Sequence, residues 1–169
     1  MKSIAASSVK GGVGKTTAAV NLAEAAARTG ARVVVWDLDP QGAATFCFRV
    51  RAEVEGGAKG LVKRSGELAR HVRSTDVVGV DLVPADLSLR HLDLHLDRRA
   101  QRLPSVSDRI AGLLDTVAPF YDLAVLDCPP GVNLAGEGVI GAVDALVVPV
   151  VPSTLSHRTL AQLDELVSE

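Results

Sequence analysis

A glycine-rich segment near the N-terminus contains the residue types that bind the phosphates of a nucleotide. The segment lies between an apolar run and a helical pattern, and it comprises Lys10, Gly11, Gly12, Val13, Gly14, Lys15, Thr16 and Thr17. Glycines let backbone N–H groups turn toward a phosphate, and the N-terminus of the following helix adds a favourable field. In such a loop Lys15 would reach the β- and γ-phosphates, Thr16 would bind Mg²⁺, and Thr17 would reach the α-phosphate side.

Two acidic segments farther along the chain each follow an apolar run. The first contains Asp37 and Asp39, and the second is an apolar stretch that ends at Asp127. Carboxylates at the carboxyl ends of parallel strands face the ligand crevice of an open α/β sheet. Asp127 is therefore predicted to hold Mg²⁺ through water. Either segment alone is commonplace, so the prediction depends on all three pieces occurring in this order.

Apolar runs alternate with helical patterns along the chain. The runs are β-branched and continuous, which is typical of strands buried on both faces of a parallel sheet. The pattern predicts one α/β domain over residues 1–169, with the P-loop NTPase fold, a mainly parallel twisted sheet and helices on both faces. The expected strands are Ile4–Val9, Arg32–Leu38, Val80–Val83, Leu123–Leu126 and Ala145–Val151, and the expected helices are Thr16–Thr29, 106–118 and 156–167.

Two segments are less regular. Residues 87–103 place leucines at helical spacing (Leu89, Leu92, Leu96 and Leu103), but the alternation over 92–96 also fits a strand. Residues 49–75 are rich in arginine and lysine and are interrupted by glycines. This composition predicts a mobile basic insertion containing one or two helical turns.

Composition excludes several classes of protein. The chain has 169 residues, a hydrophobic fraction of 47% and a formal net charge of -2, which excludes a disordered chain and a strongly basic nucleic-acid binder. The two cysteines, Cys47 and Cys128, form no disulfide framework and no zinc motif. No secretory signal is recognisable, and the longest apolar run is far shorter than a membrane helix. We therefore expect a cytoplasmic protein with no membrane partner.

The loop departs from the generic phosphate-binding pattern, which would have glycine at position 9. Val9 stands there, and the next residue is an additional lysine, Lys10. The string from Lys10 to Thr17 resembles the deviant Walker A motif of the ParA/MinD family of ATPases. The resemblance implies that Lys10 crosses the interface of an ATP-dependent homodimer and touches the phosphates of the partner's ATP.

Other stretches are similar to the same family. Residues 36–42 look like its switch I segment, and residues 43–46, 83–86 and 148–153 also resemble stretches of the family. By resemblance, Asp39 positions the attacking water and Asp37 joins the Mg²⁺ shell. The implied catalytic residues are Lys10, Lys15 and Asp39, and the implied cofactors are ATP and Mg²⁺. No Asn-Lys-x-Asp segment occurs, which disfavours guanine nucleotides.

The resemblance implies a slow ATPase that positions or segregates DNA or other cargo. Implied partners are non-specific DNA, through the basic residues of 49–73, and a ParB-like activator; nucleoid association is compatible with both. One alternative is a membrane-associated ATPase of the MinD type, although residues 160–166 are acidic rather than basic. Another is a metabolic ligase of the dethiobiotin-synthase type, whose members generally lack the extra lysine. Family members usually continue beyond the point that matches Glu169, so a truncated chain with an incomplete or different adenine pocket is expected.

Overall fold

The computed structural model describes residues 1–62, 67–100, 105–131 and 133–153. In these ranges six strands form one sheet with the order β3-β4-β2-β5-β1-β6. All neighbouring strands are parallel except β3, which pairs antiparallel with β4 at one edge. The strands are β1 (Lys2–Ala6), β2 (Val33–Asp37), β3 (Arg73–Ser74), β4 (Val80–Val83), β5 (Leu123–Asp127) and β6 (Ala145–Val147).

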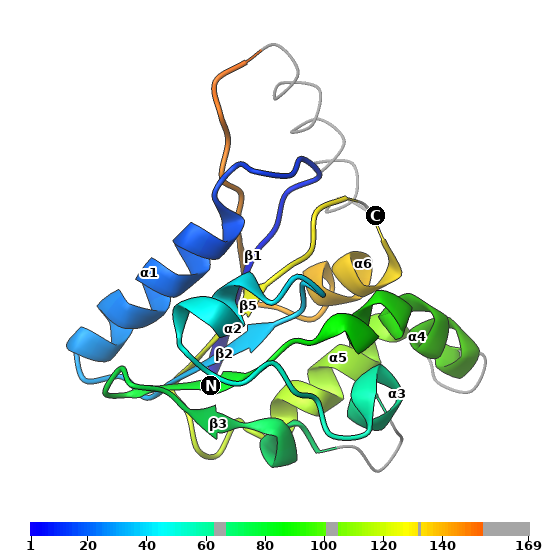
Figure 1. Cartoon of the computed structure of the whole chain (residues 1–169), viewed down its shortest axis with the longest axis horizontal. Coiled ribbons are helices and arrows are strands. Elements are labelled where there is room, and N and C mark those ends of the chain that lie inside the picture. Colours follow the sequence, from blue (N-terminus) through cyan, green and yellow to red (C-terminus); the bar gives the residue numbers. More distant parts are fainter. Residues whose placement is uncertain (63–66, 101–104, 132, 154–169) are drawn as a thin grey trace.

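Successive residues of β2 face the two layers of helices. Val33 and Val35 pack in an apolar cluster with Ala19 and Ala23 of α1 (Lys15–Arg28). Val34 and Trp36 face the opposite cluster, which contains residues of α4 (Leu92–Ala100), α5 (Val106–Asp115) and α6 (Leu134–Ile140). Figure 1 shows α1 on one side of the sheet and these three helices on the other. The predicted α/β fold with helices on both faces is thereby confirmed.

The helical interpretation of residues 87–103 is confirmed where the structure describes them. A 3₁₀ helix, η2 (Leu87–His91), leads into α4, and both belong to the layer that covers one face of the sheet. The leucines predicted to face the core, Leu89, Leu92 and Leu96, are at most 3% exposed. Leu103 and the predicted helix 156–167 lie outside the described residues. The helix predicted over 106–118 is α5.

The prediction of a mobile insertion over residues 49–75 is wrong for the part that the structure describes. Two short helical segments form there, α3 (Gly57–Leu61) and η1 (Leu68–His71), as the prediction of one or two helical turns allowed. The apolar residues of these two helical segments pack in the main core, although charged residues surround them in the sequence. The residues that anchor the segment, each at most 5% exposed, are Val54, Ala58, Leu61, Val62 and Leu68.

Three elements were not predicted, and three predicted strands are shorter than expected, among them Arg32–Leu38, which is observed as Val33–Asp37. The short helix α2 (Ala43–Cys47), α6 and the two-residue β3 are too brief to show a clear period in the sequence. The strand predicted over Ile4–Val9 ends at Ala6, and the strand predicted over Ala145–Val151 ends at Val147. Val150 and Val151 are 43% and 44% exposed, so the later part of that apolar run is not a buried strand. No described helix has the length and apolarity needed to cross a membrane.

Small residues on α1 allow the helix to lie close to the sheet. Ala23 is 0% exposed, whereas Ala25 on the same helix faces solvent. We expect Ala23→Leu to lower the free energy of unfolding by about 1–3 kcal/mol, because the added carbons have no room against β2 and β5. Urea unfolding would measure the change. Ala25→Leu is the control, since leucine is also a good helix former, and its effect should stay within about 0.5 kcal/mol. Equal effects of the two variants would contradict the close packing.

Candidate functional site

The sequence-predicted residues meet at the carboxyl ends of three neighbouring strands. The glycine-rich loop follows β1, Asp37 is the last residue of β2 and Asp127 is the last residue of β5. In the sheet register Asp127 lies opposite Ala6 on one side and opposite Asp37 on the other. The topology therefore brings together segments that are far apart in the sequence, as predicted.

The glycine-rich loop has a backbone that side chains would strain. Gly12 has φ 72° and Gly14 has φ 98°, in the left-handed region that favours glycine. A Cβ atom built at either position meets no heavy atom within 4 Å. Backbone conformation, and not crowding within the chain, is therefore what requires glycine at these positions. The loop faces open space in which a bound group would fit.

The N-terminus of α1 is available to an anion. No side chain caps it, and its first turn contains no acidic residue. The first backbone hydrogen bond of the helix runs from the Ala18 N–H to the Gly14 carbonyl at 2.8 Å, so the amides before Ala18 precede the helical ladder. Free amides and the helix field together favour a phosphate at this point.

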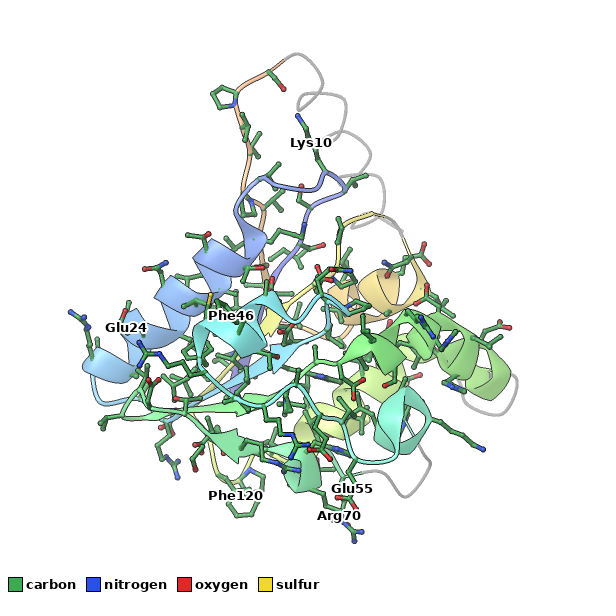
Figure 2. All side chains as sticks on the ribbon, viewed as in Figure 1. Lys10, Glu24, Phe46, Glu55, Arg70 and Phe120 are labelled. Carbon is green, nitrogen blue, oxygen red and sulfur yellow. The ribbon has the colours of Figure 1, made fainter. Side chains whose placement is uncertain are left out.

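The two lysines of the loop are placed differently. Lys15 is only 7% exposed, and its Nζ donates to the carbonyl oxygen of Lys10 at 3.4 Å. The Lys10 side chain is exposed, and Figure 2 shows it extending from the loop away from the sheet. Lys15 is thus held beside the loop, whereas the Lys10 side chain is exposed to solvent. Thr16 is half-buried and Thr17 is exposed on the first turn of α1.

Asp37 is fully buried and already has hydrogen-bond donors for both of its oxygens. Oδ1 accepts from the Asp39 amide at 3.1 Å, and Oδ2 accepts from the Thr45 amide at 2.8 Å and the Thr45 hydroxyl at 2.7 Å. Burial raises the pKa of Asp37, and these hydrogen bonds lower it in part. Sequence reasoning placed Thr45 in the family-like stretch 43–46 but gave it no role, because nothing in the sequence shows that its hydroxyl meets the Asp37 carboxylate.

Asp39 lies in a tight turn between β2 and α2. Its Oδ1 accepts from the Gln41 amide at 2.9 Å, and its carbonyl accepts from the Gly42 amide at 2.8 Å. The order Asp, Pro40, Gln41, Gly42 matches the residue preferences of a type I turn. The Asp39 carboxylate is half-buried, and one of its oxygens is committed to its own turn.

Asp127 differs from Asp37, since neither of its oxygens has a hydrogen-bond partner among the described residues although the residue is 0% exposed. Burial raises the pKa of Asp127 to about 7. The Thr16 hydroxyl lowers this pKa in part, although it does not reach hydrogen-bond geometry with the carboxylate. The negative charges of Asp37 and Asp39 raise it further, and the Lys15 ammonium opposes them.

A buried carboxylate with two unpaired oxygens fits a cation site. No group of three or more His, Cys, Asp or Glu side chains able to hold a metal occurs in the described part of the chain. Mg²⁺ does not need such a group, because it keeps several waters and binds through one or two carboxylates and the phosphates of a substrate. The adjacent Cys128 is 1% exposed, and burial raises the pKa of its thiol to about 12, so it is unreactive near neutral pH.

The parallel sheet, the glycine-rich loop before α1 and the acidic strand ends together define a P-loop nucleoside triphosphatase fold. Comparison with protein families agrees with this class, since a family model described as AAA domain matches residues 1–169. The chain belongs to this family, among the P-loop ATPases of the ParA/MinD type.

Similar proteins are known from several bacteria. The chromosome partitioning protein ParA of Caulobacter vibrioides is 30% identical over 164 residues, which cover 96% of this chain and 61% of that protein. A variant of Cyanothece McdA in complex with ATP has a TM-score of 0.89 at 27% identity, covering 99% of this chain and 63% of McdA. Cobyrinic acid a,c-diamide synthase from Mycobacterium smegmatis, with an ATP analogue and magnesium, has a TM-score of 0.86 at 28% identity, covering 99% and 65%. The chain thus spans less than two thirds of each of these proteins.

The unpaired Asp127 carboxylate generates a prediction about stability and pH. Its pKa is higher in the folded protein, about 7, than the ordinary 3.8, so the folded state resists ionisation and loses stability as pH rises through 7. We expect Asp127→Asn to raise the free energy of unfolding at pH 8 by on the order of 2–4 kcal/mol without nucleotide or Mg²⁺. The gain should shrink as pH falls from 8 to 5, where the wild-type carboxyl becomes protonated.

Urea unfolding at a series of pH values would measure this difference. Asp115→Asn is the control, because Asp115 is an exposed aspartate at the end of α5, away from the strand ends. This control should show little gain at either pH. A loss of stability in Asp127→Asn at pH 8 would show that the buried carboxylate has a partner in the folded protein and would contradict the cation site.

Proposed function

We propose that this chain is the nucleotide-binding part of a Mg-ATP-dependent, dimerising ATPase that positions or segregates DNA or other cargo. The observation that carries the proposal is the pair of lysines in the loop. Lys15 lies buried beside the cradle of amides, whereas the exposed Lys10 extends outward, as a residue acting on a second molecule would. ParA-family membership and the ATP complex of McdA support this proposal.

Each residue of the site has a role in the proposed reaction. The amides of Gly11, Gly12, Val13 and Gly14 and the first turn of α1 bind the phosphates, with Thr17 toward the α-phosphate. Lys15 leaves its contact with the Lys10 carbonyl and binds the β- and γ-phosphates. Asp39 orients the attacking water with the oxygen that its turn leaves free. Phosphoryl transfer needs positioning and charge stabilisation more than covalent help, so hydrolysis by this site would be slow without a partner.

The proposed metal site consists of Asp127 and the Thr16 hydroxyl. A bound Mg²⁺ would neutralise charge on the β- and γ-phosphates. Asp127 would hold the ion, directly or through water, because both of its oxygens are free. Asp37 would support this site from the neighbouring strand rather than bind the ion directly, since its oxygens already accept hydrogen bonds.

The proposed partners are a second copy of the chain, non-specific DNA and a ParB-like activator, in the cytoplasm and in association with the nucleoid. DNA would contact the basic residues of 49–73. Several of these cations are already engaged, since Arg49 pairs with Asp76, Arg51 with Glu53 and Arg70 with Glu67. In the described part of this segment, Lys59 and Arg73 make no ion pair with a carboxylate and are the better candidates for phosphate contacts.

A second candidate function is that of a metabolic enzyme. The similarity to cobyrinic acid a,c-diamide synthase favours it, because that enzyme binds an ATP analogue and magnesium on the same fold. A metabolic enzyme would use the loop within one chain and would have no need of an outward-pointing Lys10. The state of association with ATP therefore distinguishes the two functions.

Replacement of Lys15 and replacement of Lys10 should remove different properties of the protein. We expect Lys15→Ala to abolish ATP binding, because several charge-assisted phosphate contacts depend on this buried ammonium. We expect Lys10→Ala to bind ATP normally, to remain monomeric and to lose hydrolysis by on the order of 10³-fold, as when an arginine finger is removed. Calorimetry with ATP and Mg²⁺, light scattering and phosphate release would measure the three properties.

Arg28→Ala is a suitable control for the loss of an exposed cation, since Arg28 lies at the far end of α1 and pairs with Glu24. It should leave all three properties unchanged. Unaltered ATP affinity in Lys15→Ala would contradict the assignment of this loop as the phosphate-binding loop. Normal dimerisation and hydrolysis in Lys10→Ala would instead favour the metabolic function.

DNA binding by the basic segment, residues 49–73, should depend steeply on salt concentration. Each phosphate contact releases counterions, so the slope of log K against log salt is about -0.9 per contact. We expect the double replacement Lys59→Ala with Arg73→Ala to remove two phosphate contacts and so to make the slope less negative by about 2. Fluorescence anisotropy with duplex DNA and ATP would measure the slope. The paired cation Arg51→Ala should change the slope less. An unchanged slope in the double variant, or the absence of DNA binding, would remove DNA from the proposed partners of this segment.

A further inference from the structure

We propose that Thr45 is a positioning residue for ATP hydrolysis, which acts through Asp37 on the backbone of Asp39. This inference rests on the proposed function, because it concerns the residue assigned there to orient the attacking water. Its basis is a continuous set of hydrogen bonds that joins α2, the end of β2 and the segment after β4.

The Thr45 hydroxyl is the centre of this set. It donates to Asp37 Oδ2 at 2.7 Å and accepts from the Ala85 amide at 2.9 Å. The Thr45 amide donates to the same Asp37 oxygen at 2.8 Å. All three residues are at most 1% exposed, so water cannot replace a lost donor or acceptor here. The hydroxyl donates and accepts at once in this position, whereas a methyl group of the same size can do neither.

Asp37 passes this constraint to the turn that carries Asp39. Its second oxygen, Oδ1, accepts from the Asp39 amide at 3.1 Å. A carboxylate held at Oδ2 by two donors cannot rotate freely, so Oδ1 stays where the Asp39 amide meets it. The position of the Asp39 side chain therefore depends on two hydrogen bonds. Asp37 holds the Asp39 backbone amide, and the Gln41 amide donates to Asp39 Oδ1 at 2.9 Å.

The segment after β4 enters the same arrangement. Ala85 follows the end of β4, next to β2 in the sheet, and its amide binds the Thr45 hydroxyl. Gly42 lies at the other side of the turn, and a Cβ built there would be 3.6 Å from the Ala85 carbonyl oxygen. The turn of Asp39 therefore lies next to the backbone at Ala85, although its exposed Gln41 faces a pocket. The Thr45 hydroxyl links α2 to the same part of the backbone.

A merely structural threonine would behave differently from a positioning one. If Thr45 only filled space, a variant of the same shape without a hydroxyl would retain activity as long as it folded. If it only stabilised the fold, its loss would affect ATP binding and hydrolysis together. A positioning role predicts a loss of kcat with little change in KM, and recovery by any residue that restores the hydroxyl.

The matched variants are Thr45→Val, which keeps the shape, and Thr45→Ser, which keeps the hydroxyl. Thr116→Val is the control for removing a hydroxyl that joins two segments elsewhere, since Thr116 Oγ1 accepts from the Leu68 amide and donates to the Leu113 carbonyl. In Thr45→Val we expect kcat for ATP to fall about tenfold to a hundredfold, with KM within about threefold of wild type. Thr45→Ser should stay within about threefold of wild type, and Thr116→Val should keep its kcat.

A second measurement reports the geometry without catalysis. Amide hydrogen exchange by NMR, on the whole chain without nucleotide, should be about tenfold faster at Ala85 and Asp39 in Thr45→Val and unchanged in Thr45→Ser. Wild-type kcat and exchange in Thr45→Val would overturn the inference, as would equal losses in Thr45→Val and Thr45→Ser. A wild-type chain that binds ATP without hydrolysing it would contradict the proposed function, and the exchange rate at Asp39 would then decide whether Thr45 positions this turn.

Discussion

Two carboxylates are buried side by side at the ends of adjacent parallel strands, and the arrangement of the site follows from how their charges are managed. Asp37 and Asp127 lie opposite each other in the register of β2 and β5, and both are 0% exposed. Asp37 is stabilised from within the protein by donors from α2 and from the turn that precedes α2. Asp127 has no such donor among the described residues, so its burial is costly while the carboxyl is ionised. One aspartate therefore orders the neighbouring turn, whereas the other keeps the unpaired oxygens on which the proposed Mg²⁺ site rests.

The surrounding fold holds the two buried aspartates in fixed positions. β2 is buried along its whole length and has hydrogen-bonded neighbours on both sides, so the position of Asp37 is fixed by the sheet. On one face, alanines let α1 lie against the strands, and Lys15 and Thr16 at its N-terminus both influence the pKa of Asp127. On the other face, the described part of the basic segment packs its apolar residues under η2 and α4. In the phosphate loop itself, the left-handed backbone conformations occur at glycines.

The fold and the phosphate loop were predictable because their signals are local. Continuous apolar runs indicate buried parallel strands, and the spacing from Lys10 to Thr17 is highly specific for a phosphate-binding loop. The different environments of Asp37 and Asp127 were not predictable, because they depend on how α2 packs against the backbone at Ala85, and the family resemblance of residues 43–46 and 83–86 assigns no role to Thr45 or Ala85. The burial of Val54, Leu61 and Leu68 was missed for a related reason. Net composition describes the average environment of a segment, whereas packing is decided by single apolar side chains within it.

The two cysteines give this chain a natural handle for spectroscopy. Cys47 is the last residue of α2 and is exposed, whereas the buried Cys128 has a thiol pKa of about 12. Because thiolates are the reactive form, a maleimide dye at neutral pH would attach at Cys47 and leave the thiol beside Asp127 unmodified. The dye would lie two residues beyond Thr45, on a helix that begins just after the turn of Asp39. Unmutated protein would therefore carry a single optical reporter of this helix, with which the response of α2 to added ATP and Mg²⁺ could be measured in real time.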